Sequence, residues 1–152
     1  MLIGIISDTH GLMRPQLLAS LQEVQHIVHA GDIGSPDVLS SLRNIAPVTA
    51  IRGNIDVRGE CAALPETDAV ELGGHLFYLI HSVHDLDINP TAAKVDVIVS
   101  GHSHLAEIEA RGGVLYVNPG SCGPKRFALP VSIALITIRA RDVQARIVEL
   151  PV

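Results

Sequence analysis

Short apolar runs, each ending at a glycine or a polar residue, divide the first two thirds of this 152-residue chain. Clear examples are residues 2–6, 77–80 and 95–99. Runs of this length, bounded by such residues, are typical of buried β-strands. The pattern predicts strands over residues 2–7, 26–29, 47–52, 75–81 and 95–100.

Two stretches between the first three strands carry apolar residues at helical spacing instead. One starts near Pro15 and continues to Val24. The other starts at Pro36, directly after Ser35, an arrangement that suits an N-cap followed by proline at the first helical position. The resulting β-α-β-α-β order implies parallel strands joined by right-handed crossovers.

The remainder of the chain is mostly β. Gly73-Gly74 and Gly112-Gly113 each separate two strand-like segments, as expected for hairpin turns. A short helix is expected around residues 90–94. Further strands are predicted over residues 67–72, 105–110, 114–117, 131–138 and 143–150. With no linker or repeat, we expect a single α/β domain over residues 1–152, built as a layered sandwich of two mixed β-sheets with helices outside.

Composition narrows the class of protein. Aromatic residues make up only 3% of a chain that is 47% hydrophobic, so the core is expected to be aliphatic. No apolar stretch is long enough to span a membrane, and the N-terminal run leads straight into a motif, so we expect a strand there and no signal peptide. Cys61 and Cys122 lack CxxC spacing, which favours a reduced, cytoplasmic protein.

The formal charge of −5 argues against binding to duplex nucleic acid. A short anionic substrate is still compatible, because a bound metal would reverse the charge locally. No membrane partner is expected. The oligomeric state is left open, and a homo-oligomer is compatible with the sequence.

Candidate chemistry gathers where the predicted strands end. If these strands are parallel, their carboxyl ends share one edge, where ligands bind in open α/β sheets. Two aspartates, one asparagine and four histidines would meet there, enough for two metal ions and therefore for phosphate-ester chemistry. With no thiolate among them, the ligands suit Mn²⁺, Fe²⁺, Co²⁺, Ni²⁺ or Zn²⁺. The segments are Asp8-Thr9-His10, Gly31-Asp32, Gly53-Asn54, His81 and Gly101-His102-Ser103-His104.

In this order, and over nearly the whole chain, these motifs resemble the calcineurin-like metallophosphoesterase superfamily, above all its small bacterial and archaeal phosphodiesterases. The resemblance implies a four-layer α-β-β-α sandwich and two divalent cations, with Mn²⁺ the expected ion. Asp32 would bridge both cations, and Asp32, Asn54 and His81 would also act in catalysis. One cation would be held by Asp8, His10, Asp32 and His104, and the other by Asp32, Asn54, His81 and His102.

Two positions depart from the family pattern. Many larger members have a histidine after the asparagine that helps the leaving group to depart, and this chain has Ile55 there. Many small members have glycine after the histidine of the fifth strand, and this chain has Ser82. The first departure predicts weak cleavage of esters with poor leaving groups.

Other polar residues leave their roles open. His29 is expected to orient Asp32 or a metal-bound water, while Asp56 either orients a ligand or closes a turn. His84 belongs to a substrate loop or to solvent, and Arg14 either meets a phosphate or is an exposed residue at a helix start. A structural or solvent-exposed role is expected for His26, His75, the 118–121 turn and Lys125-Arg126.

The function predicted from these residues is hydrolysis of small phosphodiesters, by in-line attack of a hydroxide that bridges two metal ions. A non-catalytic scaffold with the same fold is the alternative from another class. A phosphomonoesterase or protein phosphatase is the third hypothesis, and the lack of a histidine after Asn54 counts against it.

Overall fold

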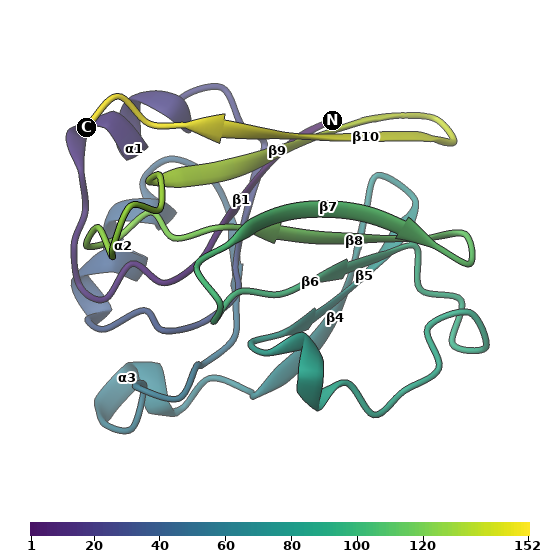
Figure 1. The fold of residues 1–152 in the computed structure, drawn as a ribbon, viewed down its shortest axis with the longest axis horizontal. Helices are drawn as coiled ribbons and strands as arrows, with labels where there is room; N and C mark the ends of the chain where they lie inside the picture. Colours follow the sequence, from purple (N-terminus) through teal and green to yellow (C-terminus); the bar gives the residue numbers. More distant parts are fainter.

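The computed structural model describes residues 1–152 and contains two five-stranded β-sheets that face each other (Figure 1). In the first sheet the order is β10-β9-β1-β2-β3. The strands β1, β2 and β3 are parallel to one another, β9 is antiparallel to β1, and β10 is antiparallel to β9. These strands are β1 (Leu2–Ile6), β2 (His26–His29), β3 (Val48–Ala50), β9 (Ser132–Arg139) and β10 (Asp142–Glu149).

The second sheet has the order β4-β5-β6-β8-β7. Its three inner strands β5, β6 and β8 are parallel, and an antiparallel strand lies at each edge. The expected glycine-pair hairpins join β4 to β5 and β7 to β8, and all four glycines have positive φ. The strands are β4 (Thr67–Leu72), β5 (His75–Ile80), β6 (Val97–Val99), β7 (Ala106–Arg111) and β8 (Val114–Pro119).

An aliphatic core fills the space between the sheets, as the composition predicts. Ile3 and Ile5 of β1 pack in one cluster with Phe77, Val97 and other residues of the second sheet. Burial of this apolar surface holds the sheets together, at about 25 cal/mol per Å² removed from water. The sheets are therefore fixed face to face, and the ends of their strands keep a defined relative position.

Helices cover only the outer face of the first sheet. α1 (Pro15–Ser20) and α2 (Pro36–Arg43) bury leucines in a cluster that includes Ile6 and Ile27. The outer face of the second sheet is covered by a 3₁₀ turn, η1 (Val83–Asp85), and the irregular segment that follows it. The sandwich of two mixed sheets is confirmed, and its second outer layer consists of this 3₁₀ turn and irregular chain. None of the helices is long and apolar enough to cross a membrane.

Two local expectations were wrong, and one short helix was missed. The first helix ends at Ser20, because the chain turns back and packs Leu21 and Val24 against Gly4 of β1. Residues 90–94 form turns, since Asn89 accepts hydrogen bonds from the amides of residues 92 and 93 and no helix propagates. The short helix α3 (Gly59–Ala62) was not predicted.

Candidate metal centre

The loops that follow β1, β2, β3, β5 and β6 meet at one end of the sandwich, at the left of Figure 1. Backbone hydrogen bonds hold these loops side by side. The amide of Asp8 donates to the carbonyl of Gly31 at 3.0 Å, and the amide of Gly101 donates to the carbonyl of His81 at 2.9 Å. Polar residues far apart in the sequence therefore share one small volume.

The seven side chains singled out in the sequence come together there, six of them in two groups. Within each group the possible ligand atoms lie within 4.8 Å of one another. In the first, Nε2 of His104 is 3.4 Å from Oδ1 of Asp8, and in the second, Nε2 of His81 is 3.3 Å from Oδ2 of Asp32. The first group is Asp8, His10 and His104, and the second is Asp32, His81 and His102.

Asp32 lies between the groups, and Asn54 completes the second. Oδ2 of Asp32 is 3.5 Å from Nε2 of His10 and 3.3 Å from Nε2 of His81, one histidine from each group. The side-chain amide of Asn54 lies 3.1 Å from Nε2 of His81 and 3.2 Å from Oδ1 of Asp32.

Three buried polar atoms of the candidate ligands have no hydrogen-bond partner within the protein. Oδ1 of Asp8 and Nε2 of His10 are buried without a hydrogen bond, as is Nδ1 of His104. Unpaired polar atoms of this kind are rare in folded proteins. A cation among these oxygen and nitrogen atoms would satisfy the first two, and the donor set suits a divalent ion of hard or borderline character. The residues present therefore fit a metal.

Hydrogen bonds from behind orient the side chains of the centre. Oδ2 of Asp8 accepts from the hydroxyl of Ser7 at 2.6 Å and from the amide of His102 at 3.1 Å. Nδ1 of His81 lies 2.7 Å from the carbonyl oxygen of Ala30, which can only accept, so Nδ1 carries the proton and donates it. Nε2 of His81 is left facing the centre, as in histidines that bind metals.

The backbone at the centre adopts an unfavourable conformation. Eight non-glycine residues have positive φ, and five of them belong to the predicted ligand set. Left-handed backbone of this kind is uncommon outside glycine and clusters at functional sites. Position 101 requires glycine for a different reason, because a Cβ there would collide with the side chains of Ser7 and Asp8. The five residues are Asp8, His10, Asp32, His102 and His104.

The pKa values of the candidate ligands shift in different directions. Burial alone would raise the pKa of Asp32, but the hydrogen bond with His81, the amide of Ile55 and the nearby histidine charges lower it to about 2. Burial would lower the pKa of His81, yet its contacts with Asp32 and the Ala30 carbonyl raise it. For His104, burial outweighs the attraction of Asp8, and its pKa is lowered. A metal at the second group therefore competes with a proton on His81.

Asp56 is a supporting residue whose role the sequence left open. It is buried, and its carboxylate accepts hydrogen bonds from the amides of Ile33, Gly34 and Gly53 at 2.8–3.1 Å. It closes the turn at Gly53 and also ties that turn to the loop behind Asp32. With three donors aimed at it, this carboxylate acts as an acceptor that positions backbone.

His29 differs from its predicted role. Its Nδ1 accepts from the amide of Gly31, so Nε2 carries the proton and donates to the hydroxyl of Thr9, which donates to the carbonyl of Ile33. The ring thus joins the loops after β1 and β2 and contacts neither the Asp32 carboxylate nor the space between the groups. Burial lowers its pKa to about 4, so it is neutral.

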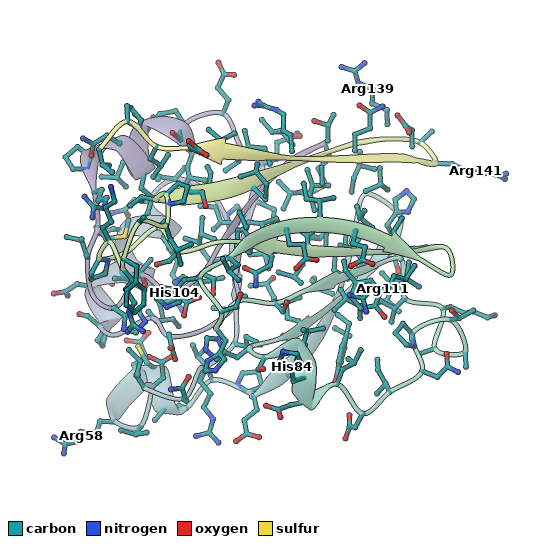
Figure 2. All side chains as sticks on the ribbon, viewed as in Figure 1. Arg58, His84, His104, Arg111, Arg139 and Arg141 are labelled. Carbon is teal, nitrogen blue, oxygen red and sulfur yellow. The ribbon has the colours of Figure 1, made fainter.

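The other open residues are also placed. Arg14 donates from Nε and Nη2 to the carbonyl of Gly123, so it braces a loop. His84 is exposed in η1 (Figure 2). Asn118 donates to the carbonyl of Gly101 and thereby supports the histidine loop after β6. The contact of Asn118 could not be seen in the sequence, because its partner lies 17 residues away along the chain.

A cleft of about 720 Å³ opens beside the second group. Asn54, His81 and His102 form part of its wall, so the centre is accessible to a small molecule. The rest of the wall includes Arg52, Glu66, Tyr78, Asp85 and Asp87.

Comparison with known proteins decides the family. The sequence model of the calcineurin-like phosphoesterase superfamily domain matches residues 1–141. The chain belongs to this superfamily. A probable metallophosphoesterase of Methanothermobacter thermautotrophicus is 32% identical over an alignment of 161 positions, which covers 98% of this chain and 92% of the relative. This phosphoesterase is therefore a metal-dependent hydrolase of phosphate esters.

Two further proteins are similar to this phosphoesterase over nearly its whole length. A phosphodiesterase of Methanocaldococcus jannaschii is 27% identical, over 98% of this chain and 100% of that protein. A solved structure of wild-type Vps29 from Entamoeba histolytica, in complex with Zn²⁺, has a TM-score of 0.76 and 23% identity, over 98% of this chain and 99% of that one. The second likeness shows that the two proteins share the fold.

Proposed function

We propose that this phosphoesterase is a phosphodiesterase with two divalent cations, with Mn²⁺ the expected ion, acting on small diesters. The observation that carries the proposal is the position of Oδ2 of Asp32 between His10 and His81, one histidine from each group. The phosphodiesterase relative of M. jannaschii supports the choice of diesters. We further propose that the whole chain acts as one domain, and that its two buried free cysteines reflect a reduced cytoplasm.

Charge favours a phosphate diester at this centre. Two divalent cations would bring four positive charges, and Asp8 and Asp32 would neutralise two of them. When bound, such cations polarise phosphoryl oxygens, lower the pKa of a bound water and so supply the nucleophile for in-line attack. Asp32 would be shared between the two cations, and His81 and Asn54 would help to hold the second cation and face the phosphoryl group.

Proton transfer to the leaving group lacks an obvious donor. Ile55 occupies the position after Asn54, and its amide donates to Oδ1 of Asp32 at 3.1 Å, while its side chain has no proton to give. Asp56 is engaged with three amides. The leaving group must then depart with little protonation, so diesters with acidic leaving groups are the favoured substrates.

The test is hydrolysis of a series of aryl and alkyl phosphodiesters, with matched monoesters, by the metal-loaded protein. We expect diesters to be preferred and the rate to fall steeply as the leaving-group pKa rises. Ile55→His should raise the rate for alkyl diesters more than for aryl diesters, because general acid catalysis contributes about 10²–10⁴-fold. A preference for monoesters would identify a phosphomonoesterase. Metal-loaded protein that hydrolyses no ester would indicate a non-catalytic scaffold.

A further inference from the structure

Exposed apolar side chains are concentrated around the metal centre. Seven large hydrophobic residues are exposed, and two of them are the chain ends. The other five all lie in loops that carry predicted ligands or pack against them, and none lies on a strand face. They are Leu12, Ile55, Val57, Leu105 and Phe127, and we call them the apolar rim.

Contacts place members of the apolar rim beside the ligands. Ile55 follows Asn54 and binds Asp32 through its amide. Val57 lines the 720 Å³ cleft together with Asn54 and His81. Leu105 follows His104 and lines a second cleft, of about 250 Å³, together with His102. A molecule held at the centre by its phosphate would therefore meet apolar surface on more than one side.

Phe127 is the most unusual member of the apolar rim. Its side chain is 93% exposed, and its φ of +52° is unfavourable for a bulky residue. The loop that carries it is anchored to the centre, because the hydroxyl of Ser121 donates to the carbonyl of Asp8 and Arg14 donates to the carbonyl of Gly123. Exposed aromatic residues with unfavourable backbone, in a loop anchored to a reaction centre, are candidates for contact with a ligand.

The neighbour of Phe127 adds a positive charge at the same place. Arg126 is not among the arginines that form ion pairs, which are Arg43, Arg52 and Arg111. Arg126 is exposed, directly precedes Phe127 and lies in the loop that hydrogen bonds of Ser121 and Arg14 tie to the segment after β1. An arginine without an ion pair and an exposed aromatic ring are thus adjacent in a loop that contacts Asp8.

We propose that the apolar rim contacts the two ester groups of the substrate, with Phe127 stacking on the one that stays on phosphorus, and that the substrates are phosphodiesters with an aromatic ester group. Arg126 pairs with the negative charge of the diester. This inference rests on the proposed function and adds its substrate class. Aromatic stacking explains why the ring is held exposed in an unfavourable conformation.

The test compares methyl p-nitrophenyl phosphate with phenyl p-nitrophenyl phosphate, which share one leaving group. We expect Phe127→Ala to lower kcat/KM for the phenyl ester about five- to tenfold and to leave the methyl ester nearly unchanged. Phe127→Leu keeps apolar area but cannot stack, so its kcat/KM for the phenyl ester should lie between those of the wild type and Phe127→Ala. Comparing variants cancels the different intrinsic reactivity of the two esters.

Binding gives a second measurement that does not depend on turnover. By calorimetry on the metal-loaded protein, diphenyl phosphate should bind about tenfold more tightly than dimethyl phosphate, and Phe127→Ala should remove most of that difference. Arg126→Ala should weaken both ligands equally. Arg141→Ala, at the opposite end of the molecule in Figure 2, is the matched control and should change neither.

Equal effects of Phe127→Ala on both esters, or none on either, would overturn this inference and leave the proposed function intact. Turnover of neither ester by metal-loaded wild-type protein would overturn the proposed function and this inference together.

Discussion

The two sheets bring different chemistry to the same edge of the molecule. The first sheet supplies both carboxylates, the Asn54 amide and His10, whereas the second supplies only imidazoles. Each group combines the two sources: Asp8 and His10 with His104, and Asp32 with His81 and His102. Neither sheet holds a complete group alone, so the centre exists only when the sheets are packed together.

The two sides are also supported differently. Behind the first sheet, Asp56 and the His29–Thr9 pair tie three loops to one another through buried hydrogen bonds. On the second side, His81 is fixed by a hydrogen bond to the carbonyl of Ala30, which directly follows β2 of the first sheet. The first side is therefore a rigid base, and part of the second side is oriented by it. Variants that disturb the base should affect the whole centre.

The largest effect should follow Asp32→Asn, which removes the charge that both groups share. We expect kcat for a p-nitrophenyl diester to fall on the order of 10³-fold, and by more than for Asp8→Asn. Metal content, measured on the same samples, should drop further in the Asp32 variant. If both variants lose the same activity and the Asp32→Asn protein still binds both metals, Asp32 is not shared between the two groups.

A smaller effect on stability is expected from Asp56→Ala, which leaves three amides without their acceptor. Since each unpaired buried donor costs about 1–3 kcal/mol, we expect a loss of roughly 4 kcal/mol in the free energy of unfolding. Urea denaturation measures this loss, and weaker metal binding should accompany it. Asp56→Asn keeps one acceptor oxygen and should lose less. A stable Asp56→Ala protein with normal metal affinity would show that this base is not needed.

The pH dependence of stability sharpens the same comparison. His29 has a pKa of about 4 in the folded protein and 6.5 as its ordinary value. Below pH 6.5 the unfolded chain binds a proton that the folded protein does not, so stability falls as pH drops from 6.5 to 4. The loss approaches roughly 3 kcal/mol. Denaturation of metal-free protein at several pH values, with His29→Gln as control, measures it. A profile with the same slope in the variant would contradict this role for His29.

Much of the fold and the position of the centre could be predicted from the sequence. Apolar runs defined β1, β5 and β6, and parallel pairing places Asp8 beside Asp32 in the first sheet and His81 beside His102 in the second. The two pairs meet only because the sheets pack face to face, which the pattern of the strands does not determine. What could not be predicted depends on contacts between distant loops, such as the three amides that bind Asp56. The end of α1 could not be predicted because Leu21 and Val24 continue the helical spacing of apolar residues, although they lie in a turn after the helix.

Metal stoichiometry, measured together with turnover, tests the central claim most directly. The protein would be stripped by a chelator and then titrated with Mn²⁺, with bound metal, thermal melting and diester hydrolysis followed on the same samples. We expect about two ions per chain, hydrolysis only when they are bound, and a chelated protein that stays folded. Its melting temperature should be lower, because saturating metal adds about 3 kcal/mol at 100-fold excess over Kd. A folded protein saturated with metal that binds a single ion, or that hydrolyses no phosphate ester, would contradict the two-metal phosphodiesterase.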